Sequence, residues 1–594
     1  MPVKTLSELF QHSVVEKPRK DLFRYKSGNR WVDVSSDEFR TAVVECGQGL
    51  VSVGVQVGDR VALLSENRLE WAMVDFGILT CGAITVPIYP TLLSQQIEYI
   101  LGDAKPTAVI CSTAEQAAKL EGIEERVPSI RNVISIEPVD RAELMRFSKL
   151  RELGAVHHRN HPDDHDRRRD SRAADDVATI VYTSGTTGNP KGVMLTHQNI
   201  VSNVLSALQV LHIDEKDSCL SFLPLSHILE RMAGQFLMVY CGVSIAHTES
   251  IEAVAANMTE IQPTIVIGVP RFYEKIYARV QDAANAGGAM KQKIFRWAKA
   301  TGDEYVQQKV AGRNLSAGLR LRHKAADALV FKKLRARTGG RLRFFVSGSA
   351  PLAKEIAEFF YAAGLTILEG YGLTETSPLI SVNTFEAYRP GSVGRPAPGI
   401  EVRIAEDGEI LTRSSSVMKG YYELPFETSE AIRDGWFATG DIGHLDEDGF
   451  LFITDRKKDL LVTAGGKNVA PQPMENALKL NEYITEAVVL GDKRKYLTVL
   501  LVPSFENLEE YARHREIPHA DLETLLASEP IQSLFQHALD QLNANLPRFQ
   551  QIKYFRLVDR EFTLEAGELT PSLKVKRKAV NQKFAELIET MYGE

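Results

Sequence analysis

Cysteine is scarce in this chain of 594 residues, and the cysteines present follow no metal-binding or disulfide pattern. Their number is odd, none forms a Cys-x-x-Cys pair, and most stand in apolar runs: Cys46, Cys81, Cys111, Cys219 and Cys241. This usage is typical of reduced, buried thiols and argues against a disulfide scaffold. We therefore expect a cytoplasmic protein in which no cysteine acts as a nucleophile.

Long hydrophobic runs are also missing. The best candidate for a membrane span, residues 71–86, is interrupted by Asp75 and ends at Pro87. It is shorter than the roughly 20 apolar residues that cross a bilayer. The N-terminus has no extended apolar core after Lys4, so a secretory signal is not expected. Any membrane contact would be peripheral, at the inner face of the membrane.

A surplus of positive charge is lacking as well. The net charge is -7, with 44% hydrophobic and 25% charged residues, which is ordinary for a globular protein and argues against general nucleic-acid binding. A chain of this length exceeds one compact core, so two or more domains are expected.

Strand-like and helix-like segments alternate in the N-terminal part. Apolar runs at 58–64, 83–87 and 108–111 predict strands, and the segments 69–81 and 94–102 predict helices. Such alternation indicates an α/β fold in which helices cover parallel sheets, with ligands bound at the carboxyl ends of the strands.

The most informative segment is a loop rich in glycine and hydroxyl groups that follows the apolar run 178–181. It supplies flexible backbone, hydroxyl donors and one cation, from Thr183, Ser184, Gly185, Thr186, Thr187, Gly188, Lys191 and Gly192. Such a loop suits a phosphate group. It differs from a Walker loop because Pro190 precedes the lysine and no hydroxyl follows it. The alternative is an ordinary polar turn between a strand and a helix.

A second loop, 369–376, follows the apolar run 365–368. Tyr371 offers an aromatic face for a base, and Glu375 is a hard oxygen ligand suited to magnesium. With the segments 343–352 and 435–441, the two loops resemble the adenylate-forming superfamily of acyl-CoA synthetases, luciferases and peptide-synthetase adenylation domains. The segment 455–471 is similar to the hinge and glycine loop of long-chain fatty acyl-CoA synthetases.

This resemblance extends from about Leu6 to the C-terminal helix and is greatest to bacterial AMP-forming long-chain ligases, with animal bubblegum-type enzymes as relatives. It implies an α/β fold with a large N-terminal domain of helix-covered sheets, residues 1–455, which binds ATP and fatty acid. A smaller, mobile α+β domain, residues 456–594, would act as a lid.

The resemblance also implies roles for single residues. Lys574 would bridge the carboxylate and the phosphate, His227 would orient the carboxylate, and Glu375 would bind Mg²⁺ together with Thr183 or Thr187. The alternatives without a catalytic role are a solvated basic tail for Lys574 and a buried core histidine for His227. The remaining ATP and AMP contacts would come from the first loop and from Gly348, Ser349, Ala350, Glu369, Gly370, Tyr371, Gly372, Thr374, Asp441 and Arg456. In particular, Tyr371 would stack on adenine and Asp441 would bind the ribose hydroxyls.

The implied reaction has two steps. ATP activates a fatty acid as acyl-AMP with release of pyrophosphate, and the thiol of CoA then displaces AMP. Between the steps the small domain would turn about Lys458 and present Gly465, Gly466 and Lys467 to the pantetheine channel. Two alternatives remain: a fatty acyl-AMP ligase that loads a carrier protein, and a non-catalytic lipid or nucleotide sensor. The acyl chain length and the oligomeric state are left open.

Two polar regions complete the analysis. Residues 157–176 are almost free of apolar side chains and predict a solvated connector; their irregularly spaced histidines leave a metal site as a weaker alternative. Residues 271–343 predict helices in which basic side chains outnumber acidic ones. They would form either a surface that lies on anionic lipid or an ordinary solvated face.

Overall fold

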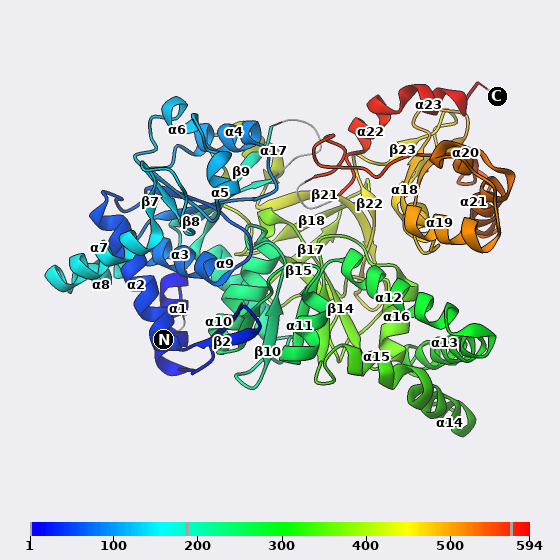
Figure 1. Cartoon of the computed structure of the whole chain (residues 1–594), viewed down its shortest axis with the longest axis horizontal. Coiled ribbons are helices and arrows are strands. Elements are labelled where there is room, and N and C mark those ends of the chain that lie inside the picture. Colours follow the sequence, from blue (N-terminus) through cyan, green and yellow to red (C-terminus); the bar gives the residue numbers. More distant parts are fainter. Residues whose placement is uncertain (1–2, 184–188, 571–573, 594) are drawn as a thin grey trace.

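The computed structural model describes residues 3–183, 189–570 and 574–593. It shows a large α/β body and a smaller C-terminal part that lies over one end of it (Figure 1). Within the described ranges no helix is both long and apolar enough to cross a membrane.

The body contains two large, mainly parallel sheets. The first has the strand order β19-β9-β8-β4-β3-β5-β6-β7, with β3 (Arg60–Leu64), β4 (Ile84–Ile88), β5 (Ala108–Cys111), β6 (Asn132–Ser135), β7 (Met145–Arg146), β8 (Val177–Thr183), β9 (Lys191–Thr196) and β19 (Gly420–Tyr421). The second has the order β16-β15-β14-β13-β12-β10-β11-β1-β2, with β1 (Phe23–Ser27), β2 (Arg30–Val34), β10 (Ser218–Ser221), β11 (Ser244–His247), β12 (Ile265–Gly268), β13 (Phe344–Ser347), β14 (Thr366–Gly372), β15 (Leu379–Val382) and β16 (Arg395–Pro396).

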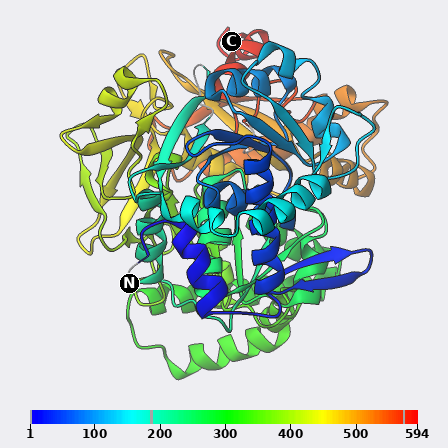
Figure 2. The same ribbon diagram turned by 90° about the vertical axis from the view of Figure 1, so that its left-hand side faces the viewer.

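A third, antiparallel sheet completes the body. It contains β17 (Glu401–Ile404), β18 (Glu409–Arg413), β20 (Ile432–Arg433), β21 (Trp436–Leu445) and β22 (Leu451–Arg456). In Figure 2 these yellow-green strands form a separate layer beside the blue and green parts of the body. The third sheet leads directly into the C-terminal part through β22.

The predicted alternation of strands and helices is confirmed. The segment 69–81 forms α3 (Leu69–Thr80) and the segment 94–102 forms α4 (Ser94–Ala104), between strands that start or end within two residues of the predicted positions. Neighbouring β3, β4 and β5 are parallel, as the crossover helices require. Asp75, which interrupts the apolar run, is fully buried in α3 and paired with Arg231, with Nη2 to Oδ1 at 2.5 Å.

One continuous core fills the space between the two large sheets. It includes side chains of β8 and β9 on one side and of β10, β12 and β13 on the other. Between them lie α9 (His197–Leu208) and a π-helix, η1 (Glu230–Leu237), which continues into α10 (Met238–Cys241). The N-terminal helices α1 (Leu6–Glu16) and α2 (Ser36–Ser52) pack on the same core.

The segment 157–176 is largely solvent-exposed, as predicted, but it is mostly helical rather than an irregular connector. The region belongs largely to α7 (Phe147–Asn160) and α8 (Asp164–Asp170). Asp164 pairs with Arg167 and Arg168, three and four residues on, which stabilises a helix of polar side chains. Gly154 lets α7 approach α2 so closely that a Cβ would collide with the Glu45 carbonyl oxygen. Among the described residues no group of three or more histidine, cysteine or acidic side chains could hold a metal ion.

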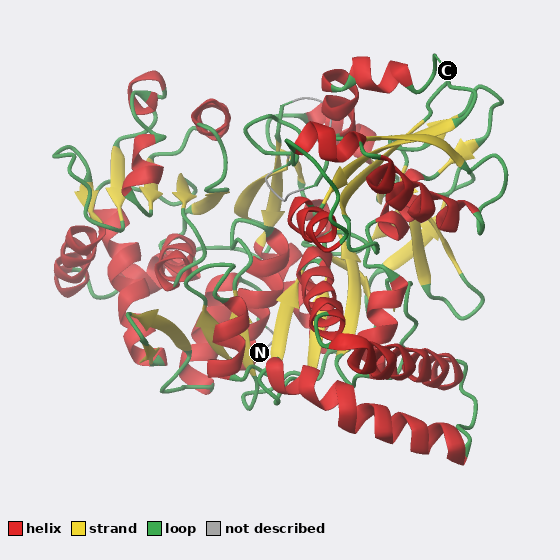
Figure 3. Ribbon diagram, turned by 45° about the vertical axis from the view of Figure 1, so that its right-hand side comes forward, coloured by secondary structure: helices red, strands yellow, loops and turns green. Residues whose placement is uncertain are grey.

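The helices predicted for 271–343 are confirmed. They are α12 (Pro270–Asn285), α13 (Gly288–Val310), α14 (Ala317–Ala326) and α15 (Lys332–Arg337), with a π-helical turn, η2 (Asp327–Phe331), before α15. The ends of α13 and α14 project from the body, away from the sheets (Figures 1 and 3). The shorter helix α16 (Lys354–Ala362) packs between α13 and the second sheet.

The C-terminal part has its own sheet and its own cores. The sheet consists of β25 (Ile484–Leu490), β26 (Leu497–Pro503) and β27 (Ile552–Leu557), so the two strands predicted here are confirmed. One face packs on α18 (Pro471–Leu478), α19 (Phe505–His514), α20 (Leu522–Ala527) and α21 (Glu529–Asn543). The other face packs on α22 (Arg577–Lys583) and α23 (Ala585–Thr590).

Candidate active site

A cavity of about 980 Å³ lies where the three sheets of the body meet the C-terminal part. It opens at the carboxyl ends of the parallel strands, as expected for an α/β fold. Most described site residues predicted from the sequence line it: Thr183, Lys191, His227, Gly348, Ser349, Ala350, Glu369, Gly370, Tyr371, Gly372, Thr374, Glu375, Asp441, Arg456, Lys458 and Lys574. Ser184, Gly185, Thr186, Thr187 and Gly188 lie outside the described residues.

The first predicted loop joins two antiparallel strands, so the alternative of a turn between a strand and a helix does not hold. Thr183 ends β8 and Lys191 begins β9, and the two residues are paired in register. The Lys191 ammonium lies 5.0 Å from the centre of the Tyr421 ring. The Tyr421 hydroxyl donates a hydrogen bond of 3.0 Å to Glu375 Oε1. Lys191 of the first loop and Glu375 of the second loop thus both interact with Tyr421.

The second predicted loop starts later than expected. Residues 369–372 continue β14, because this strand gains an antiparallel partner in β15. Burial raises the pKa of the Glu369 carboxyl to about 8, and the Gly391 amide donates to it at 3.3 Å. Glu369 is therefore largely protonated at neutral pH. At the end of β13, Ser349 has a φ of +70°, an unusual backbone angle of the kind that gathers at functional sites.

Tyr371, Asp441 and Arg456 form a hydrogen-bonded group on the other wall. The Tyr371 hydroxyl donates to Asp441 Oδ2 at 2.7 Å, and Arg456 Nε lies 2.7 Å from Asp441 Oδ1. Burial, and then Asp441, raise the pKa of Tyr371 well above its usual value. Asp441 lies within β21 and pairs in register with Arg456 on β22. The stacking of Tyr371 on adenine and the contact of Asp441 with ribose stay predictions.

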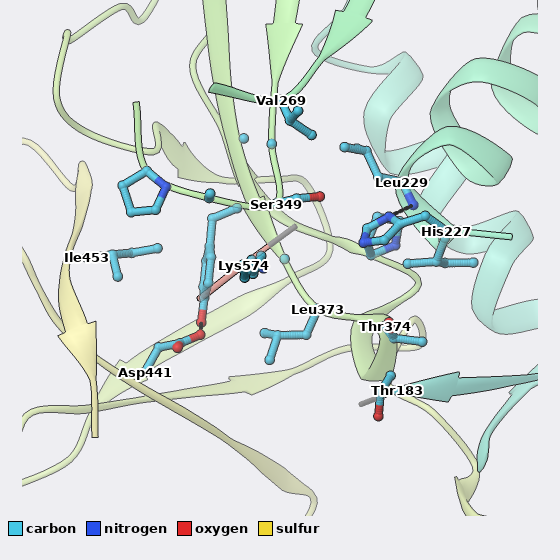
Figure 4. A pocket seen from close by; sticks show the side chains of 18 of the residues that line it. Thr183, His227, Leu229, Val269, Ser349, Leu373, Thr374, Asp441, Ile453 and Lys574 are labelled. Atoms are coloured by element: carbon cyan, nitrogen blue, oxygen red, sulfur yellow. Dashed lines mark hydrogen bonds between the residues drawn. The ribbon is translucent and has the colours of Figure 1, made fainter. Parts of the chain in front are cut away.

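Lys574 projects into the middle of the cavity, between His227 and Asp441 (Figure 4). Its side chain is exposed to the cavity but surrounded by protein. Desolvation, and then Arg456, lower its pKa to about 8. The structure therefore does not place Lys574 on a solvated tail; it reaches the same space as the nucleotide residues predicted from the sequence.

His227 is half-buried and neutral. Desolvation, and then the Lys574 charge, lower its pKa to about 4. Its Nδ1 accepts a hydrogen bond of 3.1 Å from the Leu229 amide, so the ring proton is assigned to Nε2. The ring can thus donate one hydrogen bond to an anion, and it is poorly suited to act as a base at neutral pH.

The predicted glycine loop is the part that the structure does not bring to the cavity. Gly465, Gly466 and Lys467 form the exposed tip of a hairpin between β23 (Leu461–Val462) and β24 (Asn468–Val469). None of the three is among the described residues that line the cavity. Lys458 lies at the rim, and burial followed by Arg456 lowers its pKa.

The oxygen ligands predicted for magnesium fit that ion. Thr183 and Glu375 line the same cavity, and one oxygen of Glu375 is held by Tyr421. Carboxylate and hydroxyl oxygens are hard ligands, and protein sites of this kind leave the other positions of Mg²⁺ to water and phosphate.

An apolar arm extends the cavity between the large sheets. Its wall comes from α9 and the segment that follows it, from η1 and α10, and from the strands β12 and β13: Ala207, Leu211, Ile213, Met232, Ala233, Leu237, Met238, Ile267 and Phe344. Phe344 stands at the beginning of β13 and Ser347 at its end, so the arm follows the sheet for about 10 Å. All of these side chains are apolar, so the arm suits an apolar chain better than a polar group.

Comparisons with known proteins agree with this geometry. Residues 10–422 match the family described as AMP-binding enzyme, and residues 458–594 match the AMP-binding enzyme C-terminal domain. The chain belongs to the AMP-binding enzyme family. It is 39% identical to "Long-chain-fatty-acid--CoA ligase FadD15" of Mycobacterium tuberculosis over 95% of this chain and 93% of that protein. It is 32% identical to "Long chain acyl-CoA synthetase 6, peroxisomal" of Arabidopsis thaliana over 100% of this chain and 87% of that protein.

Solved structures share the fold of this AMP-binding enzyme. The anthranilate CoA ligase AuaEII in complex with anthranoyl-AMP superposes with a TM-score of 0.75, at 19% identity and 99% coverage of both chains. The adenylation domain of a carboxylate reductase from Mycobacterium chelonae superposes with a TM-score of 0.77, at 22% identity, covering 100% of this chain and 92% of that one. At these identities the likeness establishes the adenylate-forming fold alone.

Sequence reasoning missed several cavity residues of this AMP-binding enzyme. Tyr421 belongs to none of the segments that carried the resemblance, and its partner Glu375 is 46 residues away. The apolar arm is assembled from α9, η1 and β13, which no local pattern connects. Arg271, Lys479 and Glu486 also line the cavity, at its opening between the body and the C-terminal part.

Proposed function

We propose that this protein is a long-chain fatty acid–CoA ligase that works in two steps through acyl-AMP. The observation that carries the proposal is the position of Lys574, which lies between the Tyr371–Asp441–Arg456 group and His227 at the entrance of the apolar arm. The names of the relatives at 39% and 32% identity support the long-chain substrate. We further propose that residues 1–455 form the adenylating domain and residues 456–594 the lid.

In the first step, a carboxylate oxygen of the fatty acid attacks the α-phosphorus of ATP. A new P–O bond forms, the bond to the bridging oxygen of the β-phosphate breaks, and pyrophosphate leaves. Lys574 neutralises charge on both the carboxylate and the α-phosphate, and His227 Nε2 donates to the carboxylate. Lys191 and the first loop hold the phosphates, while the Asp441 carboxylate accepts hydrogen bonds from the ribose hydroxyls. Bound through Glu375 and Thr183, Mg²⁺ would supply further charge neutralisation at the phosphates.

In the second step, the thiolate of CoA attacks the acyl carbon of acyl-AMP. The C–S bond forms, the C–O bond to AMP breaks, and AMP takes the electron pair. For this step the small domain turns about Lys458, withdraws Lys574 and brings the hairpin tip 465–467 to the cavity opening. In the structure this hairpin is exposed and does not line the cavity, which supports the assignment of this domain arrangement to the first step.

The apolar arm supports the substrate class and gives a specific test. Ala207 lies on α9 and is almost fully buried in the wall. Replacing it by phenylalanine would fill part of the arm, so Ala207→Phe should move the preferred substrate from long to medium chains. Because kcat/KM measures discrimination between substrates, we expect its ratio for oleate over octanoate to fall by about 10- to 100-fold. An unchanged ratio would exclude this arm as the acyl site.

Loading of a carrier protein is the second candidate, supported by the shared adenylation chemistry. Formation of AMP and acyl-CoA from ATP, CoA and a series of acids from octanoate to oleate separates the two. The CoA-ligase proposal predicts CoA-dependent thioester formation that is greatest with long chains. Acyl-AMP accumulation without acyl-CoA would favour carrier loading, and nucleotide binding without pyrophosphate release would favour a sensor.

Peripheral contact with anionic lipid is also proposed, for a cytoplasmic enzyme. Residues 311–343 contain ten lysine and arginine residues and a single acidic one, Asp327. On this projecting region Leu321 is 71% exposed and Leu329 is 49% exposed, beside exposed Lys332 and Lys333. Cations that flank exposed leucines suit an anionic bilayer surface. The fraction of enzyme that sediments with phosphatidylglycerol vesicles should fall in the double variant Lys332→Glu, Lys333→Glu. An unchanged fraction would exclude this surface as the lipid contact.

A further inference from the structure

The first turn of α12 meets the small domain through charged side chains. Arg271 and Glu274 are three residues apart, so they lie on the same side of this helix. Opposite them stand Lys479, directly after α18, and Glu486 on β25. These side chains lie at the opening of the cavity, and none of them has been assigned a nucleotide or acyl contact above.

These charges attract the small domain. Arg271 Nη2 donates to Glu486 Oε1 at 2.5 Å, and Lys479 Nζ lies 3.9 Å from Glu486 Oε2. The Glu486 side chain is 9% exposed and the Arg271 side chain 36%. A carboxylate buried to this degree depends on its cationic partners, because removal of one partner leaves a charge out of contact with water.

We propose that α12 holds the small domain over the nucleotide through the contact of Arg271 with Glu486. The proposal rests on the two-step function proposed above. Arg271 is then a positioning residue: it holds Glu486, and through the small domain it keeps Lys574 in the cavity. When the domain turns away, Glu486 and Arg271 both return to water.

The two half-reactions test the attractive contact separately. Fatty-acid-dependent exchange of pyrophosphate into ATP reports the first step, and transfer from supplied acyl-AMP to CoA reports the second. Arg271→Ala and Glu486→Gln should lower the exchange rate by about tenfold and leave the transfer rate within about twofold, because only the first step needs the present arrangement. Arg271→Lys should recover part of the exchange. Equal losses in both steps, or no loss, would overturn the proposal.

A distance measurement keeps the test independent of activity. All five cysteines are buried, so fluorescent labels can be directed to exposed cysteines introduced by Lys291→Cys on α13 and Arg513→Cys on α19. Energy transfer between them should show more open molecules in Arg271→Ala than in the unmodified enzyme, whereas Lys275→Ala, an exposed side chain on the same helix, should match the unmodified enzyme. Identical distributions in Arg271→Ala and the unmodified enzyme would exclude the contact. Absence of exchange with every fatty acid in the unmodified enzyme would instead contradict the proposed function while leaving this distance test valid.

Discussion

At the scale of single residues, the site is organised around one lysine between two different surroundings. On one side of Lys574 lie Asp441 and Arg456, and on the other lies His227, whose ring is kept neutral by burial and by the lysine charge. The pKa of Lys574 is lowered to about 8, so the lysine is mostly protonated at neutral pH and loses its charge when the pH rises slightly above neutrality. This balance makes the first step sensitive to pH above neutrality.

The first prediction concerns this pH dependence. Adenylation requires charged Lys574, whose pKa is lowered to about 8 in the ligand-free enzyme, so kcat/KM for pyrophosphate release should fall as the pH rises through about 8. In kcat the fall should begin at higher pH, because bound phosphates favour the ammonium form. A profile of kcat/KM that stays flat from pH 7 to roughly pH 10 would contradict the role of Lys574.

The second prediction concerns Tyr421, which holds Glu375. Tyr421→Phe removes the hydroxyl that donates to Glu375 and keeps the ring beside Lys191. The loss of about 1 kcal/mol should raise KM for MgATP by roughly fivefold. Tyr422→Phe, at the adjacent tyrosine, is the control, since Tyr422 is not among the described residues that line the cavity. Equal KM values in both variants would remove Tyr421 from the site.

At the scale of helices and strands, sequence patterns located elements better than they located contacts. Apolar runs placed β3 to β5 and β25 to β26 correctly, because hydrophobic periodicity is a local property. The pattern failed at the end of α7 and at α8, where pairing of Asp164 with two arginines and close packing of Gly154 on α2 stabilise helical turns that carry few apolar side chains. It also failed at β14, which gains length from β15, a partner that no local signal reveals.

A third prediction concerns the pair that joins α3 to η1. Both Asp75 and Arg231 are fully buried, and Arg231 Nη1 also donates to Thr179 on β8 at 2.7 Å. Asp75→Ala leaves the Arg231 charge uncompensated in the core, so the free energy of unfolding should fall by about 3–5 kcal/mol. Thermal unfolding of the variant should therefore occur at a clearly lower temperature than that of Asp37→Ala, an exposed carboxylate on α2. Equal unfolding temperatures would contradict this account of the pair.

At the scale of the whole molecule, the sequence identified the pieces of the site and the structure brought them together. Resemblance to a family pointed to Lys191, Glu375, Asp441 and Lys574, because each stands in a recognisable segment. The apolar arm and the contact of Arg271 with Glu486 depend on how sheets and domains pack, and their residues are up to 215 positions apart. Nothing in the local sequence around Arg271 distinguishes it from the other exposed cations of the same region.

The central claim is that Lys574 belongs to the first step and leaves the cavity in the second. Comparison of Lys574→Ala with the unmodified enzyme tests it most directly. Two rates are measured in each protein: the exchange of pyrophosphate into ATP with oleate, and the formation of oleoyl-CoA from supplied oleoyl-AMP. The account predicts a loss of exchange of about 100-fold or more, with transfer to CoA largely retained. Unchanged exchange, or loss of both steps together, would contradict it.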